Sequence, residues 1–248
     1  LFLCAAESLF EDDIKKYLDL GADVNCTDDD MDDTALHLAC RSDRPLNLAR
    51  GTDTVLHLAC RADIVILLLD RKCNPNHQNI QGKTALHYAA KTDSTYIVKI
   101  LIDKGCNPDQ KDELGKTALH YAAKAESTDI VKVLIENGCT PDQKDKLGKT
   151  ALHYAAESGS TDIVKVLIEN GCTPDQKDEL ERTALHMVTS SPLVEPDMIR
   201  LLIDAGCSID DKDKKGNTAL HYAAEYPSED IFKELLEYGC NPELRDTL

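Results

Sequence analysis

Apolar positions along this 248-residue chain recur in short helical patterns that repeat at a nearly constant interval. In one interval, Leu119, Ala122 and Ala123 have the spacing of a single helix face. A second apolar stripe follows, at Ile130, Val131, Val133, Leu134 and Ile135. Gly138 follows it, as expected of a residue that ends a helix in the left-handed conformation. Each interval therefore predicts two short helices and a polar connecting loop.

One tetrapeptide marks the start of each interval. Thr-Ala-Leu-His begins at Thr34, Thr84, Thr117, Thr150, Thr183 and Thr218, and a Thr-Val-Leu-His variant begins at Thr54. From Thr84 to Thr183 successive starts are 33 residues apart, and the last step is 35. Because helices this short are marginal alone, each unit must be stabilised by stacking on its neighbours.

The motif around this tetrapeptide resembles that of the ankyrin repeat. The family pattern D-x-x-G-x-T-P-L-H-x-A-A corresponds here to residues 112–123, with Ala118 in place of the proline. The G-A-D-V-N ending corresponds to residues 21–25. The resemblance implies an all-α fold: an ankyrin-repeat solenoid of stacked helix-turn-helix units joined by β-hairpin-like loops. We expect one ankyrin-repeat domain over 1–248, with about eight units.

The period breaks between 34 and 84. The step from Thr34 to Thr54 is only 20 residues, and the next step is 30. The unit around 41–53 is therefore either truncated or interrupted by residues missing between Arg50 and Gly51. Since the first residue is not Met, we also expect the chain to be a fragment of a longer protein.

The charge balance limits the class of partner. The formal net charge is −17, from 45 acidic and 28 basic residues. This balance opposes sequence-independent nucleic-acid binding and docking on an anionic membrane. No apolar run reaches the roughly 18 residues of a transmembrane helix. A basic or mixed-charge protein partner is easier to reconcile with this charge, although solubility alone explains much of the acidity.

Two sets of repeated side chains could suggest metal or redox chemistry. The histidines recur once per unit, too far apart to share an ion, and the resemblance implies a hydrogen-bonding role within and between repeats. The cysteines after the closing glycines form a ladder too widely spaced for disulfides, so we expect buried thiols in a reducing, cytoplasmic compartment. Cys26 lies outside the ladder and could be more exposed. We therefore expect no cofactor, no metal and no enzymatic activity. The histidines are His37, His57, His87, His120, His153, His186 and His221, and the ladder is Cys73, Cys106, Cys139, Cys172, Cys207 and Cys240.

An acidic cluster occupies the first loop. It comprises Asp28, Asp29, Asp30, Asp32 and Asp33. A solvated hairpin and a docking point for a basic segment are both open interpretations. The spacing does not match a calcium-binding loop.

In the ankyrin family, partners usually contact the hairpin tips and the exposed side of the first helices, which implies a concave binding face. By position, the candidate partner-binding residues are Lys83, Lys91, Glu113, Leu114, Lys116, Lys124, Lys146, Leu147, Lys149, Glu157, Glu179, Leu180 and Arg182. Within this set, basic residues at the end of each loop recur beside leucines. We hypothesise that this Lys/Leu row seats an extended acidic-apolar segment, although duplicated units would also repeat their surface residues.

The function expected from the sequence is a non-catalytic protein–protein interaction scaffold. The alternative is a regulatory or targeting segment of a larger multidomain enzyme, channel or effector. Oligomeric state and the identity of the partner do not follow from the sequence.

Overall fold

A computed structural model describes most of the chain. It covers residues 2, 3, 6, 11–41, 52–92, 94–190, 196–225 and 229–246, without the side chains of 52–60. The chain divides into two compact units. Unit 1 comprises 1–121 with 136–139, and unit 2 comprises 122–135 with 140–248. The Arg50–Gly51 junction lies outside the described residues.

Unit 1 is built from two layers of helices. The inner layer contains α3 (Ala35–Cys40) and α5 (Ala85–Ala90), which pack against each other. The outer layer contains α4 (Thr52–Asp70) and α6 (Thr95–Asp103), and each packs on its inner partner. A further helix, α2 (Glu11–Asp19), contacts α4.

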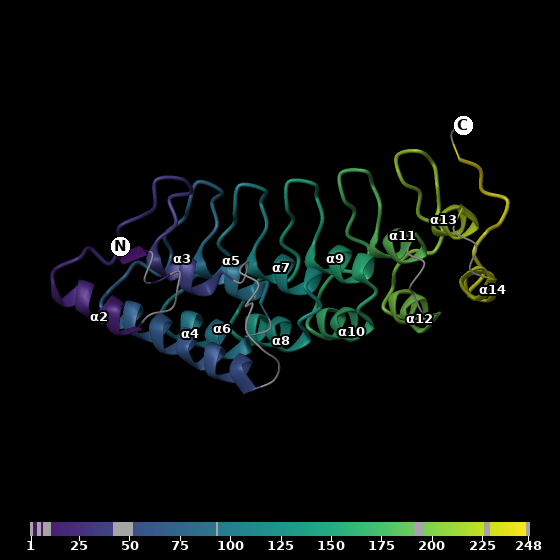
Figure 1. The fold of residues 1–248 in the computed structure, drawn as a ribbon. Helices are drawn as coiled ribbons and strands as arrows, with labels where there is room; N and C mark the ends of the chain where they lie inside the picture. Colours follow the sequence, from purple (N-terminus) through teal and green to yellow (C-terminus); the bar gives the residue numbers. More distant parts are fainter. Residues whose placement is uncertain are drawn as a thin grey trace. The chain divides into compact units, whose positions relative to one another are not determined.

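Unit 2 repeats this two-layer arrangement. Its inner helices are α9 (Ala151–Ser158), α11 (Ala184–Thr189) and α13 (Ala219–Glu225), and its outer helices are α10 (Thr161–Glu169), α12 (Pro196–Asp204) and α14 (Glu229–Glu237). Inner helices contact inner, and outer contact outer, as can be followed in Figure 1. Two helices complete the described set: α7 (Ala118–Lys124), which spans the division between the units, and α8 (Thr128–Glu136).

Threonine and histidine of the repeated tetrapeptide start each inner helix. Thr84 is extended, with φ −100° and ψ 170°, and forms a capping box with His87. Its backbone N–H donates to His87 Nδ1 at 2.9 Å. Because that N–H can only donate, Nδ1 is the acceptor, and the proton is on Nε2. Nε2 then donates to the carbonyl of Lys116 in the next loop, at 3.1 Å. One histidine thus caps its own helix and holds the following hairpin.

The hairpin loops are closed by backbone hydrogen bonds and fixed by an acidic residue at their base. Asp145 N donates to Lys149 O at 2.9 Å. The Asp145 Oδ1 atom in turn accepts from the N–H groups of Leu147 and Lys149, at 2.8 and 2.9 Å. Asp112, Asp178 and Asp213 make the same pair of contacts, and Asn79 replaces them in one loop. These side chains are buried because their oxygens are satisfied by backbone donors.

Neighbouring loops approach so closely that one position requires glycine. Gly148 has φ +72°, and a Cβ there would lie 2.7 Å from the backbone nitrogen of Glu179. That nitrogen donates to Leu147 O at 2.9 Å, which ties one hairpin tip to the next. The loops therefore form a continuous hydrogen-bonded edge within the unit, which confirms the expected hairpin-like connections.

The second marker at Thr54 starts no inner helix of its own. Helix α4 begins at Thr52 and runs without interruption to Asp70, where the sequence predicts two short helices. It packs on α3 and on α6, so it is the outer helix that follows α3. The expectation of an inner helix at Thr54 is therefore wrong.

The all-α class of stacked helix-turn-helix units is confirmed. The sole strand-like pairing in the described residues is an isolated antiparallel bridge between Thr27 and Thr34. No described helix combines the length and apolar character needed to cross a membrane.

Candidate partner-binding face

Tyrosines of the inner helices connect those helices to the hairpin loops. Tyr121 donates its hydroxyl proton to Asp112 Oδ2 at 2.7 Å. In unit 2, Tyr154 donates to Asp145 at 2.6 Å, and Tyr222 to Asp213 at 2.8 Å. Since the other oxygen of each carboxylate holds the loop, the tyrosine ring is fixed in orientation beside it.

In unit 1 these rings carry the lysines predicted from the repeat. Lys83 Nζ lies 5.6 Å from the ring centroid of Tyr88 and 5.5 Å from that of Tyr121. Lys116 Nζ lies 5.9 Å from the Tyr121 centroid. All three distances are within the range of cation–π attraction. The lysines are therefore positioned by aromatic faces on the loop side of the inner helices.

In unit 2 the equivalent basic residues are engaged in ion pairs. Lys149 is buried, at 9% exposure, and its Nζ lies 2.8 Å from Glu157 and 5.3 Å from the Tyr154 centroid. Arg182 pairs with Asp178 at 2.7 Å. These two cations are thus partly neutralised by carboxylates of their own repeats.

The hairpin tips present apolar side chains to solvent. Leu114 and Leu147 are each 56% exposed, and Leu180 is 51% exposed. Ile80 is 54% exposed one position earlier in its loop. Exposed leucines at tips that backbone hydrogen bonds hold in place can contact a partner without rearrangement.

The remaining predicted residues are exposed at loop tips or at inner-helix ends. This group comprises Lys91, Glu113, Lys124, Lys146, Glu157 and Glu179. Of the predicted set, the structure brings Lys83 and Lys91 to one cavity. The Lys/Leu row has Lys83, Leu114 and Lys116 in unit 1, and Leu147, Lys149, Leu180 and Arg182 in unit 2.

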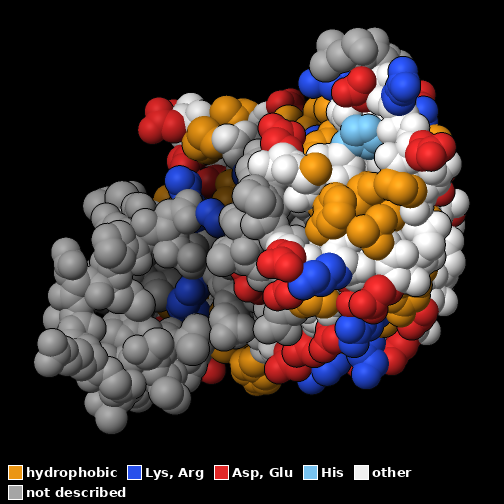
Figure 2. All heavy atoms as spheres, turned by 90° about the vertical axis from the view of Figure 1, so that its right-hand side faces the viewer, with side chains coloured by type: hydrophobic (Ala, Val, Ile, Leu, Met, Phe, Trp, Pro, Cys, Tyr) orange, Lys and Arg blue, Asp and Glu red, His pale blue; other side chains and the backbone are white. Residues whose placement is uncertain are grey.

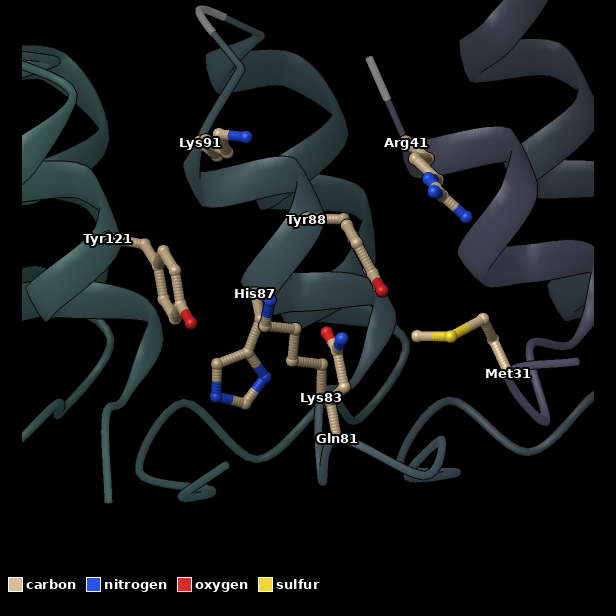
Figure 3. A pocket seen from close by; sticks show the side chains of 8 residues that line it. All are labelled: Met31, Arg41, Gln81, Lys83, His87, Tyr88, Lys91 and Tyr121. Atoms are coloured by element: carbon tan, nitrogen blue, oxygen red, sulfur yellow. The ribbon is translucent and has the colours of Figure 1, made fainter. Parts of the chain in front are cut away.

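The cavity in unit 1 has a volume of about 220 Å³. It is lined by Met31, Arg41, Gln81, Lys83, His87, Tyr88, Lys91 and Tyr121. Figure 3 shows Tyr121 on one side, Met31 and Arg41 on the other, and Tyr88 and Lys83 between them. Three lining residues are cationic and none of these eight is acidic, so the cavity favours an anionic group.

Sequence reasoning missed four of these lining residues: Met31, Arg41, Tyr88 and Tyr121. The tyrosines belong to the repeated Leu-His-Tyr-Ala-Ala segment, in which the apolar pattern identifies only the leucine and the two alanines as one helix face. The available signal was the recurrence of a tyrosine directly after the repeat histidine, at positions 88, 121, 154 and 222.

A comparison with known protein families shows to which family the chain belongs. A model of the family described as ankyrin repeats (3 copies) matches residues 43–112, 96–178 and 170–246. The chain belongs to the ankyrin-repeat family. Ankyrin repeats are generally protein-interaction modules, and the family is generally non-catalytic. No curated protein matches the chain.

The histidines of this ankyrin-repeat chain have the structural role that was expected. Five more, at 37, 120, 153, 186 and 221, make the same Nδ1 contact with their threonine. Burial lowers the pKa of His87, His153 and His186, so these rings are neutral at neutral pH. The side chain of His57 lies outside the described residues.

The cysteine ladder is buried, and within the described residues none of its six cysteines forms a disulfide. Cys106 Sγ donates to the Pro75 carbonyl at 3.3 Å, which satisfies the thiol within the stack. Cys26 is more exposed than these, as expected. No group of histidine, cysteine or acidic side chains within the described residues could hold a metal ion.

The acidic cluster of the first loop is largely occupied by contacts within unit 1. Asp28 accepts from the backbone of Met31 and Asp33, and Asp33 accepts from Asn79 Nδ2 at 2.7 Å. Asp29 and Asp30 are exposed. The cluster therefore serves mainly to fold its hairpin.

A second hollow, of about 210 Å³, lies at the α13–α14 end of unit 2. Figure 2 shows hydrophobic side chains gathered on the face turned to the viewer. Leu220, Phe232 and Leu244 are among the lining residues, and Phe232 is 37% exposed.

Proposed function

We propose that this chain is a protein-interaction module that binds an extended acidic-apolar segment of a partner protein. The segment lies along the hairpin tips and the loop side of the inner helices. The observation that carries the proposal is the arrangement of unit 1, where Lys83 and Lys116 lie on tyrosine faces near the exposed Leu114.

The surface has the two properties that such a segment requires. Leucines at the hydrogen-bonded tips offer apolar contacts at little entropic cost. The lysines offer positive charge on a chain whose net charge is −17, so an acidic segment is attracted locally and repelled elsewhere. The alternation of leucine and lysine contacts would fix the position of the bound segment along the face.

The segment, the scaffold role and the site residues are tested by capture from cell extract followed by direct titration. Wild type is compared with Lys83→Glu/Lys116→Glu, and with a control of equal charge change, Lys99→Glu/Lys132→Glu, on the exposed faces of the outer helices. We expect a partner retained by wild type and the control to be lost by the first variant.

Circular dichroism and thermal unfolding first establish that all three proteins fold alike. Equal loss by both variants would indicate a general charge effect. Equal retention by both would remove the Lys/Leu row from the binding site.

A further inference from the structure

The residue eight positions after the loop lysine is acidic in one repeat and basic in another. In the repeat that begins at Thr150, Lys149 forms an ion pair of 2.8 Å with Glu157. In the repeat that begins at Thr84, the same positions are Lys83 and Lys91. Glu157, whose carboxylate pairs with Lys149, thus corresponds to the cationic Lys91, which lines the cavity of unit 1 together with Lys83.

The surroundings of Lys83 agree with this difference. Within the described residues, its Nζ contacts the rings of Tyr88 and Tyr121 and no carboxylate. Its backbone is held at both ends, since its N–H donates to Asn79 and its carbonyl accepts from His37 Nε2. The ammonium group is therefore placed at the cavity by a rigid main chain and two fixed rings.

The remaining lining adds charge and apolar walls. Arg41 lines the cavity while its Nη1 contacts Asp33 at 3.3 Å, so its charge is partly compensated. His87 is neutral at neutral pH and contributes no charge. Met31 and the tyrosine rings supply apolar surface for the methylene or methyl group that carries an anion.

The volume of the cavity suits the end group of one side chain of a bound peptide. Its 220 Å³ is well above the roughly 30 Å³ that one water occupies in the liquid. It is below the range of about 300–1,000 Å³ typical of small-molecule sites. A group on a bound peptide fits this range better than a free metabolite does.

We propose that this cavity recognises the phosphate of a phosphorylated serine or threonine in the bound partner segment. The inference rests on the proposed function, since the segment must be on this face for the phosphate to enter. A phosphate carries close to two negative charges and three acceptor oxygens, which match two lysines and an arginine better than one carboxylate does. The phosphate is attracted by cations within one Debye length, about 8 Å. Its repulsion by acidic residues farther away is screened by salt.

The test uses peptide libraries with a fixed central residue and randomised acidic and apolar flanks. The centre is phosphoserine, glutamate or serine, and binding to the 248-residue chain is measured by fluorescence anisotropy. Lys91→Glu builds the ion pair that the chain already accommodates at Lys149 and Glu157, and Lys99→Glu is the outer-face control. We expect wild type and Lys99→Glu to prefer phosphoserine over serine by at least about tenfold. Lys91→Glu should lose that preference, so that its affinities for the phosphoserine and serine libraries differ by less than those of wild type.

Other outcomes separate the two proposals. Binding of all three libraries with equal affinity, or a phosphoserine preference that survives Lys91→Glu, overturns the phosphate pocket and leaves the interaction module standing. If no library binds, free O-phosphoserine is titrated while the Lys83 and Tyr121 resonances are followed by NMR. Saturable shifts that Lys91→Glu abolishes would support the phosphate pocket, while the failure of every peptide library would contradict the proposed binding of an extended segment. Absence of shifts would overturn both.

Discussion

Arg182 donates two hydrogen bonds to one carboxylate oxygen of Asp178, at 2.9 Å from Nε and 2.7 Å from Nη2. In other repeats that oxygen accepts from a tyrosine hydroxyl, as in Tyr154 to Asp145. The repeat of Arg182 has Met187 at the tyrosine position. Arg182 thus supplies Asp178 with the hydrogen bonds that a tyrosine supplies in other repeats, and Met187 stands where that tyrosine would be.

This compensation predicts the result of exchanging the pair. Arg182→Lys should destabilise the chain by about 1–2 kcal/mol, because the almost fully buried Asp178 loses the two guanidinium hydrogen bonds to its Oδ2 atom. Burial tends to raise the pKa of Asp178, but the hydrogen bonds from Arg182 lower it below its ordinary value. Adding Met187→Tyr should restore most of the stability. Urea unfolding of the single and double variants measures the coupling, and simple additivity of the two effects would contradict the compensation.

Two glycines with similar backbone conformations should respond differently to alanine. Gly148 and Gly171 have φ of +72° and +86°, so alanine at either costs about 1 kcal/mol or more in backbone strain. At Gly148 the new Cβ also meets the Glu179 nitrogen at 2.7 Å, whereas at Gly171 nothing lies within 4 Å. Gly148→Ala should therefore be the more destabilising by at least about 1 kcal/mol, since a tip-to-tip hydrogen bond must break. Equal midpoints in urea would show that the loops move apart freely.

The buried histidines predict loss of stability in mild acid. Burial lowers the pKa of His37, His87, His153 and His186 in the folded chain. Below the ordinary value of about 6.5 the unfolded chain binds protons that the folded chain does not. The stabilisation is thus complete above that pH and falls as pH decreases, by up to about 1.4 kcal/mol per pH unit for each histidine.

Urea unfolding at pH 7.5, 6.5 and 5.5 measures this dependence. His153→Gln should be less stable than wild type at pH 7.5 and should show a shallower decline below pH 6.5. A wild-type stability that stays constant from pH 7.5 to 5.5 would contradict the lowered pKa of the buried histidines.

Thiol reactivity should follow burial along the chain. Burial raises the pKa of Cys73 and of Cys207 to about 12, and both are nearly inaccessible. Cys26 is partly exposed. Maleimide at pH 7.5, read by peptide mass spectrometry, should label Cys26 well before Cys73 or Cys207. Comparable labelling rates at all three would mean that the stack opens readily.

How far the sequence predicts the structure depends on local loop chemistry. The helix at Thr84 was predictable because Gly82 and Asn79 precede it and build the hairpin that its cap requires. Thr54 has the same tetrapeptide pattern, but Thr52 and Ala49 occupy those two positions. The residue types that build the Thr84 hairpin are therefore missing, and the segment from Thr52 is part of the outer helix α4.

The candidate site was predictable in its apolar part and less so in its charged part. The exposure of Leu114 follows from its place at a hairpin tip. The burial of Lys149 does not, because it depends on Glu157, eight residues later at the end of the inner helix. The cavity depends on side chains from three segments far apart in sequence, including Met31 and Tyr121.

The central claim, that the hairpin tips contact the partner, is tested most directly by site-specific photo-cross-linking in cell extract. A benzophenone side chain is placed at Leu114, on a tip of unit 1, or at Tyr96, on its outer helix α6. The two positions are 56% and 61% exposed, so their accessibility is matched. The account predicts a discrete cross-linked adduct from Leu114 and none from Tyr96. Adducts from Tyr96 alone, or from neither position, would contradict it.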